Sequence, residues 1–407
     1  MIVLLMMAGL GVDVGYLKYQ KQQMQKAADA GALAAASALI YYGAGNQTQI
    51  MNAGQADAAA NGFPNGNGIT VQVNNPPQTN NDPFVGNNAY VEVIVSQAQP
   101  TFFMRLAGYN SVNVSSRAVA TSISSGAACV YTLAPNGADS LIIGNGTGAQ
   151  VSTSCEILVA SASDSAISIG NGSTMTTNIG VVGGCNGGEC GTLQGDNELT
   201  TGIAPFSDPL ANLPSPAVPP CQYNGPQTFN NPVTNTIPNG VYCGGIIIAT
   251  SGTVTFSPGT YYLVGGGLSL QGSPTVSGSG VTFYNTQGNG YSYGPINITG
   301  TPTGSLTAAT TGDLAGILFY QDRSIPVNYP NSTSNINGSG NGSHGMIYTG
   351  TLYFPTTTLI YTGARVINPY ELLVAWNLTL LGNTTLFNNY STLPNGSSPI
   401  ATATLVE

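Results

Sequence analysis

Charged residues are scarce in this sequence. They make up 6% of its 407 residues, against roughly 25% in an ordinary soluble protein. No lysine follows Lys26, only four arginines do, and the formal net charge is −9. Nucleic-acid binding requires clustered lysine and arginine to neutralise phosphates. The composition therefore excludes a nucleic-acid partner, and solubility must come from Asn, Ser, Thr, Gln and the 54 glycines.

Histidine and paired carboxylates, which many enzymes need, are also missing. His344 is the single histidine and lies in SGNGSHGMIY without an acid nearby, so a histidine-dependent triad is not expected. Glycosidases need paired carboxylates, and calcium sites need a cage of oxygen ligands. Only Glu189, Asp196 and Glu198 come close together, as a weak Ca²⁺ site or, better, a solvated loop. We predict no catalytic residue, no cofactor and no metal site.

The six cysteines lie in one Gly/Ser/Thr-rich part of the chain. They are Cys129, Cys155, Cys185, Cys190, Cys221 and Cys243. An even number in such a setting is typical of disulfides in an exported protein. A zinc site would favour CxxC or CxH pairs, whereas the closest spacing here is CNGGEC. The sequence does not fix the connectivity, and pairing in sequential order is the simplest of the possibilities.

Asn-x-Ser/Thr sequons are frequent. Examples are Asn113, Asn145, Asn171, Asn297, Asn377, Asn383 and Asn395. A chain this rich in Asn, Ser and Thr produces such sequons by chance, which is the interpretation we favour. Surface glycosylation is the alternative.

Residues 2–42 are predicted to form one helix. Strong helix formers fill the segment, no proline interrupts it, and GAG at 43–45 ends it. Its uniformly apolar part is shorter than the roughly 20 residues that span a bilayer. No basic segment precedes that part, so we expect either a processed end or further residues upstream. The apolar side chains that we expect in assembly are Met1, Ile2, Val3, Leu4, Leu5, Met6, Met7, Leu10, Val12, Val14 and Leu17.

The second half of this helix, KAADAGALAAASAL, is rich in small residues. Ala, Gly and Ser let helices approach closely. Helix propensity alone would also explain the alanines. We favour packing against other copies of the chain, so that residues 1–45 form an assembly helix.

Residues 46–125 are predicted to form a small α+β layer. ITVQVNN and AYVEVIVSQ alternate apolar and polar residues as strands do. PTFFMRLAG follows as a short helix, and SVNVSSRAVATSI as a third strand. The order β–β–α–β gives a layer able to pack on the long helix.

Residues 126–407 have a different pattern. Short apolar segments such as LIIGNGTGAQV and LSLQGSPTVSGSGVTF are separated by Gly, Asn and Ser turns. This pattern favours a mainly-β domain, most simply a parallel β-solenoid, with a β-sandwich as the alternative. A proline-rich excursion is expected at about 191–240.

Two further features of this part could serve contacts. QDRS places Asp322 beside Arg323, which we interpret as a structural charge pair or a polymer contact. Tyrosine occurs 21 times. It suits interfaces, and it suits strands equally well.

The opening GLGVDVGYLKYQKQQMQKAADAGALAAASAL resembles the N-terminal segment of TadG-like proteins of Tad/Flp pilus assembly. A hydrophobic run, a V-D-x-G step, a Lys/Gln patch and an alanine tract follow in the same order. YVEVIVSQAQPTFFMRL and SSRAVA continue the resemblance. It implies a pseudopilin-like component of bacterial pilus machinery. Leu5 stands where a mature type IV pilin usually carries glutamate, so the pilin-type contact of that glutamate is not implied.

We expect a non-enzymatic structural subunit of an extracellular filament, exported through the bacterial inner membrane and then secreted or held at the cell surface. Its partners would be other copies of itself, with the pilus-assembly machinery and the inner membrane during biogenesis. The alternative is an envelope-anchored adhesin or minor pilus component that binds a surface or carbohydrate. A carbohydrate-active β-solenoid enzyme is a weaker alternative, because it needs three or more acids on adjacent rungs.

Overall fold

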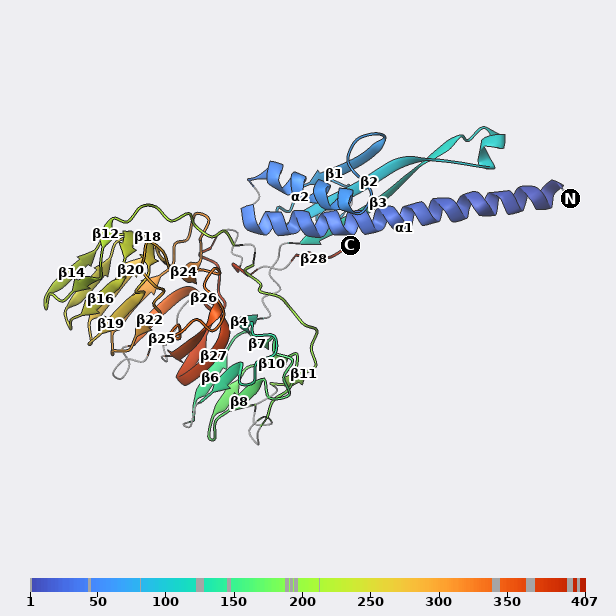
Figure 1. The fold of residues 1–407 in the computed structure, drawn as a ribbon. Coiled ribbons are helices and arrows are strands. Elements are labelled where there is room, and N and C mark those ends of the chain that lie inside the picture. Colours follow the sequence, from blue (N-terminus) through green and yellow to red (C-terminus); the bar gives the residue numbers. More distant parts are fainter. Residues whose placement is uncertain are drawn as a thin grey trace. The chain divides into compact units, whose positions relative to one another are not determined.

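The structure is a computed structural model with two compact units (Figure 1), residues 1–125 with 400–407 and residues 126–399. It describes the chain except for residues 1, 43–44, 81, 122–127, 145–147, 187–189, 191–192, 194–196, 212, 339–344, 364–369, 394–397 and 401–402. For residues 2–8, 40–41 and 404 it describes the backbone only. Below, the two units are called unit 1 and unit 2.

Unit 1 consists of two helices and a small antiparallel sheet. The helices are α1 (Ile2–Tyr42) and α2 (Gln47–Ala60). The strands are β1 (Ile69–Asn74), β2 (Tyr90–Pro100), β3 (Ser111–Thr121) and β28 (Thr404–Leu405), in the order β1-β2-β3-β28. A short 3-10 helix, η1 (Met104–Ala107), joins β2 to β3. The predicted long helix and β–β–α–β layer are confirmed, while α2 and β28 were not predicted.

The alanine-rich half of α1 lies in the core of unit 1. It packs on α2, β2 and β3, with Ala28, Ala32 and Ala35 fully buried. Gly31 shows how close the two helices come, because a Cβ there would lie 2.9 Å from the carbonyl oxygen of Gly54 in α2. Small residues allow this approach. The alanine face is thus occupied within the chain, which differs from our expectation that copies would pack there.

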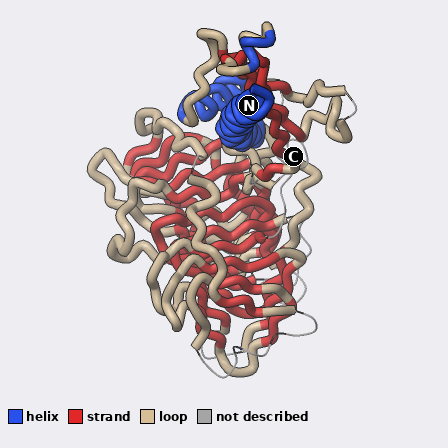
Figure 2. Tube along the Cα trace, turned by 90° about the vertical axis from the view of Figure 1, so that its right-hand side faces the viewer, coloured by secondary structure: helices blue, strands red, loops and turns tan. Residues whose placement is uncertain are grey.

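Unit 2 is a large parallel sheet consistent with a β-solenoid, and its strands lie stacked one above another in Figure 2. Every strand ladder that the structure describes in unit 2 is parallel. A β-sandwich would be built of antiparallel sheets. The solenoid prediction is therefore confirmed over the sandwich.

The strands of unit 2 stack in three columns. The first holds β12 (Tyr223–Asn224), β15 (Gly240–Cys243), β18 (Gly259–Val264), β21 (Val281–Thr286), β24 (Ile317–Gln321), the middle of β26 (Met346–Gly363), the start of β27 (Glu371–Leu386), β4 (Ala128–Thr132), β7 (Glu156–Val159), β10 (Ile179–Val181) and β11 (Leu199–Thr201).

The second holds β13 (Gln227–Phe229), β16 (Ile246–Ala249), β19 (Leu268–Gln271), β22 (Ile296–Ile298), β25 (Ser334–Asn337), later parts of β26 and β27, β5 (Leu141–Ile143) and β8 (Ile167–Ile169). The third holds β14 (Thr234–Ile237), β17 (Thr253–Phe256), β20 (Thr275–Ser279), β23 (Thr303–Thr307) and the start of β26, and also the end of β27, β6 (Gln150–Thr153) and β9 (Thr174–Thr176).

The strands of unit 2 that come first and last in the sequence, β4 and β27, both lie in the middle of this stack. From β4 it builds outward to β11, and the segment 202–222, with no strand at 202–211 or 213–222, then carries it to β12 at the opposite end (Figure 1). From β12 the chain adds strands back toward the middle of the stack, until β27 pairs with β4 and Leu373 lies opposite Val130. The first and last rungs are therefore neighbours, and we call this β27–β4 pairing the seam.

Aromatic side chains fill much of the interior. Tyr261, Phe283 and Phe319 stack along the first column, with ring centroids 5.0 and 5.2 Å apart. Buried tyrosine hydroxyls find acceptors, as when Tyr261 donates to the carbonyl of Ile237 at 2.7 Å. Many tyrosines thus act as core strand residues.

Candidate assembly site at the N-terminal helix

The apolar side chains at the start of α1 are exposed wherever the structure describes them, until the sheet begins to cover the helix. Leu10 is 50% exposed, Val12 54% and Val14 42%. Leu17 is partly buried and packs against the core. The side chains of Met1, Ile2, Val3, Leu4, Leu5, Met6 and Met7 lie outside the described residues. Of the expected assembly residues whose side chains the structure describes, Leu10, Val12 and Val14 are exposed and Leu17 packs on the core.

Asp13 interrupts this apolar surface and is itself buried. Its carboxylate accepts three backbone N–H groups from the hairpin tip, from Phe102 at 2.7 Å, Phe103 at 2.8 Å and Met104 at 2.6 Å. Burial by itself would raise the pKa of Asp13. The three N–H donors and nearby Arg105 outweigh it and hold the pKa below its usual value. The carboxylate therefore stays charged and fixes the tip to the helix, and we call this arrangement the clasp.

Ring packing supports the clasp. Phe103 lies against Gly9, where an added Cβ would come within 2.6 Å of its ring. Tyr16 meets Phe102 edge-to-face at 5.3 Å and donates to the side chain of Gln99 at 3.1 Å. The first half of α1 is thus held along the hairpin, which runs beside it (Figure 1).

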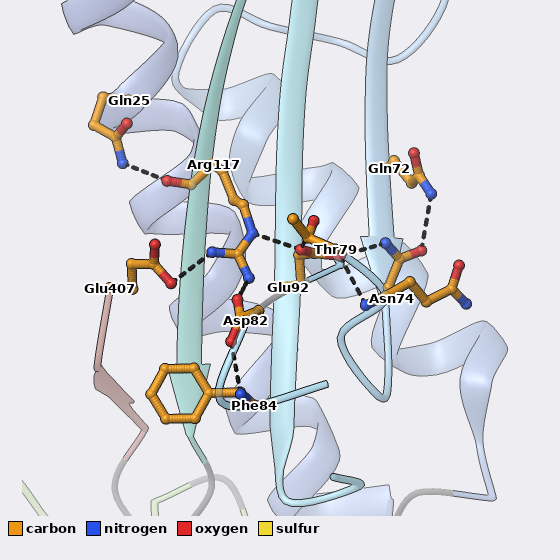
Figure 3. Close-up of polar contacts among 10 residues, drawn as sticks. Gln25, Gln72, Asn74, Thr79, Asp82, Phe84, Glu92, Arg117 and Glu407 are labelled. Carbon is orange, nitrogen blue, oxygen red and sulfur yellow. Dashed lines mark hydrogen bonds and ion pairs between the residues drawn. The ribbon is translucent and has the colours of Figure 1, made fainter. Parts of the chain in front are cut away.

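A second polar cluster lies around Arg117 on β3 (Figure 3). Arg117 pairs with Asp82, with Glu92 at 2.5 Å and with Glu407 at 2.6 Å. Glu92 is buried and also accepts the Asn74 amide at 2.7 Å and the Thr79 hydroxyl. Gln25 of α1 donates to the Arg117 carbonyl at 2.8 Å. One cation thus ties the loop before β2, the sheet and the segment around β28 together.

The cysteines of unit 2 form three disulfides in sequential order. The pairs are Cys129–Cys155, Cys185–Cys190 and Cys221–Cys243. The first crosses from the start of β4 to the residue before β7, and the third joins Cys221, two residues before β12, to the end of β15. The first and third bonds therefore tie adjacent rungs, one beside the seam and one at the end of the stack.

The sequons differ in exposure. Asn113, Asn171 and Asn383 are exposed, whereas Asn297 and Asn377 are half-buried. Asn145 and Asn395 lie outside the described residues. Glycosylation of these asparagines stays a prediction.

The residues considered as catalytic or metal-binding candidates do not form a cluster in the part of the chain that the structure describes. His344, Glu189 and Asp196 lie outside the described residues, and Glu198 is exposed. Across the described ranges, no group of three or more His, Cys, Asp or Glu side chains could hold a metal ion.

Asp322 and Arg323 do not form the charge pair that we expected. Asp322 accepts the Thr286 hydroxyl at 2.6 Å. Arg323 donates to the Tyr353 hydroxyl and to the Leu210 carbonyl, both at 2.7 Å. The expectation was wrong because Asp322 and Arg323 lie in a turn after β24, where Asp322 accepts the Ser324 N–H and each side chain has other partners. Arg323 instead holds the strand-free return segment on unit 2.

Sequence reasoning missed Asp13 and Arg117 as organising residues. An acid within an apolar helix was the available signal for Asp13, because a buried carboxylate requires donors. No helix in the described part of the chain has a stretch long and apolar enough to cross a membrane.

The first 38 residues of the chain match a family model described as putative Flp pilus-assembly TadE/G-like. This segment includes the exposed apolar side chains, Asp13 and most of the alanine tract. No curated protein and no solved structure matches the chain. A Tad segment together with disulfides indicates an exported, extracytoplasmic protein. Residues 1–38 are therefore a Tad domain, of the TadE/G-like Flp pilus-assembly type, at the N-terminus of the chain.

Proposed function

We propose that this protein is a structural subunit of an extracellular bacterial filament, assembled through the exposed start of α1. The observation that carries the proposal is that Leu10, Val12 and Val14 remain exposed although the clasp holds this part of α1 in place. An ordered apolar surface of this kind is a candidate contact with another protein. Neighbouring copies would bury it, so that the head-to-tail contact could repeat along a filament.

Unit 2 supports a role outside the cell. Its stack is braced by disulfides, which persist in oxidising compartments. Its low charge suits a displayed structural surface more than catalysis. We propose that unit 2 forms the displayed part of the subunit, and that the protein is non-enzymatic.

Export through the inner membrane and contact with the pilus-assembly machinery belong to the same proposal. The Tad domain supports them, because its family is one of pilus assembly. The finished subunit would be secreted or held at the cell surface.

Shearing of intact cells tests the proposal. We expect the protein in the sheared fibre fraction, and N-terminal sequencing of that material identifies the mature end. Recovery only in washed membranes would favour the envelope-anchored adhesin and would contradict the filament.

A further inference from the structure

One end of unit 1 gathers large exposed apolar side chains from two distant segments. They belong to α1 at residues 9–19 and to the hairpin tip at residues 102–109, and we call the whole surface the apolar end. Its exposed members are Leu10, Val12, Val14, Tyr19, Phe102, Phe103, Leu106 and Tyr109. Leu106 is 84% exposed and Tyr109 62% exposed. The clasp brings the two segments together, so this surface is a built feature of the unit.

The exposed residues of α1 are not confined to one face. Each residue advances the helix by about 100°, so Leu10 and Val14 lie on one side of the helix while Val12 lies on nearly the opposite side. Only the side with Gly9, Asp13 and Tyr16 meets the hairpin. A flat partner would cover one stripe of such a helix, whereas a surrounding medium covers all of it. The geometry favours immersion of this end.

The charge beside the apolar end is positive. Lys18, Lys21, Lys26 and Arg105 are exposed, and they are four of the seven basic residues of a chain with 16 acidic ones. Asp13 is the only acid in residues 9–28 and 100–112, and it is buried. The ion pairs among the described residues all centre on Arg117, and none of them includes these four cations. A medium that is apolar inside and anionic at its surface complements this end.

We propose that the hairpin tip is itself a membrane-inserting element, which enters an anionic lipid bilayer beside the start of α1 before assembly. Phe102, Phe103 and Leu106 would lie below the headgroups, with Tyr19 and Tyr109 at their level. The lysines and Arg105 would contact lipid phosphates. The clasp makes the tip a second inserted element. This inference goes beyond the filament role and does not depend on it.

Flotation of the full-length monomeric chain with vesicles tests the inference. The probe is a vesicle of phosphatidylcholine alone or with phosphatidylglycerol. We expect strong binding only to the anionic vesicles. Lys18→Gln with Lys21→Gln should weaken it by about fivefold for each lysine. Equal binding to both kinds of vesicle would overturn the anionic part of the proposal.

The double variant Leu106→Ser with Tyr109→Ser tests the hairpin tip. Both side chains are exposed, so the fold should survive, and α1 is unchanged. We expect at least about tenfold weaker binding to anionic vesicles, from the apolar area lost. The matched control is Val233→Ser in unit 2, where Val233 is 73% exposed, and it should bind as wild type.

Wild-type affinity in the tip variant would overturn insertion of the tip. If the wild-type chain ignores vesicles but forms oligomers that the tip variant cannot form, the occupant is a second copy and the lipid proposal fails. Filament formation is measured separately on sheared cells. A chain that binds vesicles and never polymerises would contradict the proposed function and leave this inference standing.

Discussion

The Asp13 carboxylate lies 2.8 Å from the backbone nitrogen of Phe103 and accepts its N–H. This contact joins the first half of α1 to a hairpin tip that is distant in sequence. The two neighbouring N–H groups, of Phe102 and Met104, reach the same carboxylate. A single acid thus determines that the exposed apolar residues of α1 and of the tip form one surface.

The clasp should persist from neutral to mildly acidic pH. The pKa of Asp13 is lowered in the folded chain, because its N–H donors and Arg105 outweigh the effect of burial. The charged Asp13 therefore stabilises the fold fully at any pH above its pKa in the unfolded chain, which is about 3.9. This stabilisation is lost only as the pH falls through the lower pKa of Asp13 in the folded chain. Amide chemical shifts of Phe102, Phe103 and Met104 should stay constant down to about pH 4.

Asp13→Asn is the control for that titration. It removes the charge, so the tip amides should exchange with solvent about tenfold faster or more, and the acid titration should vanish. A midpoint above pH 5 in the wild type, or unchanged exchange in Asp13→Asn, would show that the carboxylate does not hold the tip.

Replacing Arg117 should destabilise unit 1 strongly. Arg117→Met leaves buried Glu92 without its cation, at a cost of about 3–5 kcal/mol. Glu407→Gln is the matched control. It removes an exposed partner of the same arginine and should cost less than about 1 kcal/mol. Hydrogen exchange of β2 and β3 peptides in increasing urea measures both, and equal effects would refute the central role of Arg117.

The end disulfide should act locally. Cys221→Ser with Cys243→Ser removes a bridge between the end rung and β15, at a cost of about 3 kcal/mol. Because β12 pairs only with β15 among the described strands, fraying should stop there. Limited proteolysis should cut first around residues 221–237. Early cleavage near β4 in this variant would contradict a locally acting bond.

The seam should couple the two halves of unit 2. Leu373 is fully buried opposite Val130, so Leu373→Ala should cost about 2–5 kcal/mol. Protection should fall both in β4–β11 and in β24–β27. Leu199 is half-buried on the end strand β11, so Leu199→Ala should cost less than about 1 kcal/mol and loosen only that end. If Leu373→Ala lowered protection in only one of these groups, β4–β11 or β24–β27, the two halves of unit 2 would be independent of each other.

The repeating parts of the fold follow from local sequence. LSLQ and TVTF alternate apolar and polar residues between glycine-containing turns, and both form short parallel strands, β19 and β17. The long helix followed from helix propensity and ended at Tyr42 as expected. In contrast, α2 has a glycine in its middle and only Ile50 and Met51 as large apolar residues, so its helical pattern was weak.

Long-range pairings could not be read from the sequence. Nothing in ELLVAWNLTL indicates β4 as its neighbour, because parallel strands share the same apolar pattern on every rung. The clasp depends on backbone N–H groups at the hairpin tip, and these carry no side-chain signature. Arg117 was visible as a rare cation, yet two of its partners lie in β2 and the loop before it, and the third, Glu407, is 290 residues away.

The most direct measurement of the central claim is electron cryomicroscopy of filaments sheared from cells that carry Leu10→Ser, Val12→Ser and Val14→Ser together, compared with wild type. The account predicts wild-type filaments in which these side chains are buried between copies. In the triple variant, filaments should be lost while the secreted chain keeps its folded unit 2. Val233→Ser should assemble normally. Wild-type filaments from the triple variant, or filaments in which residues 10–14 face solvent, would contradict the account.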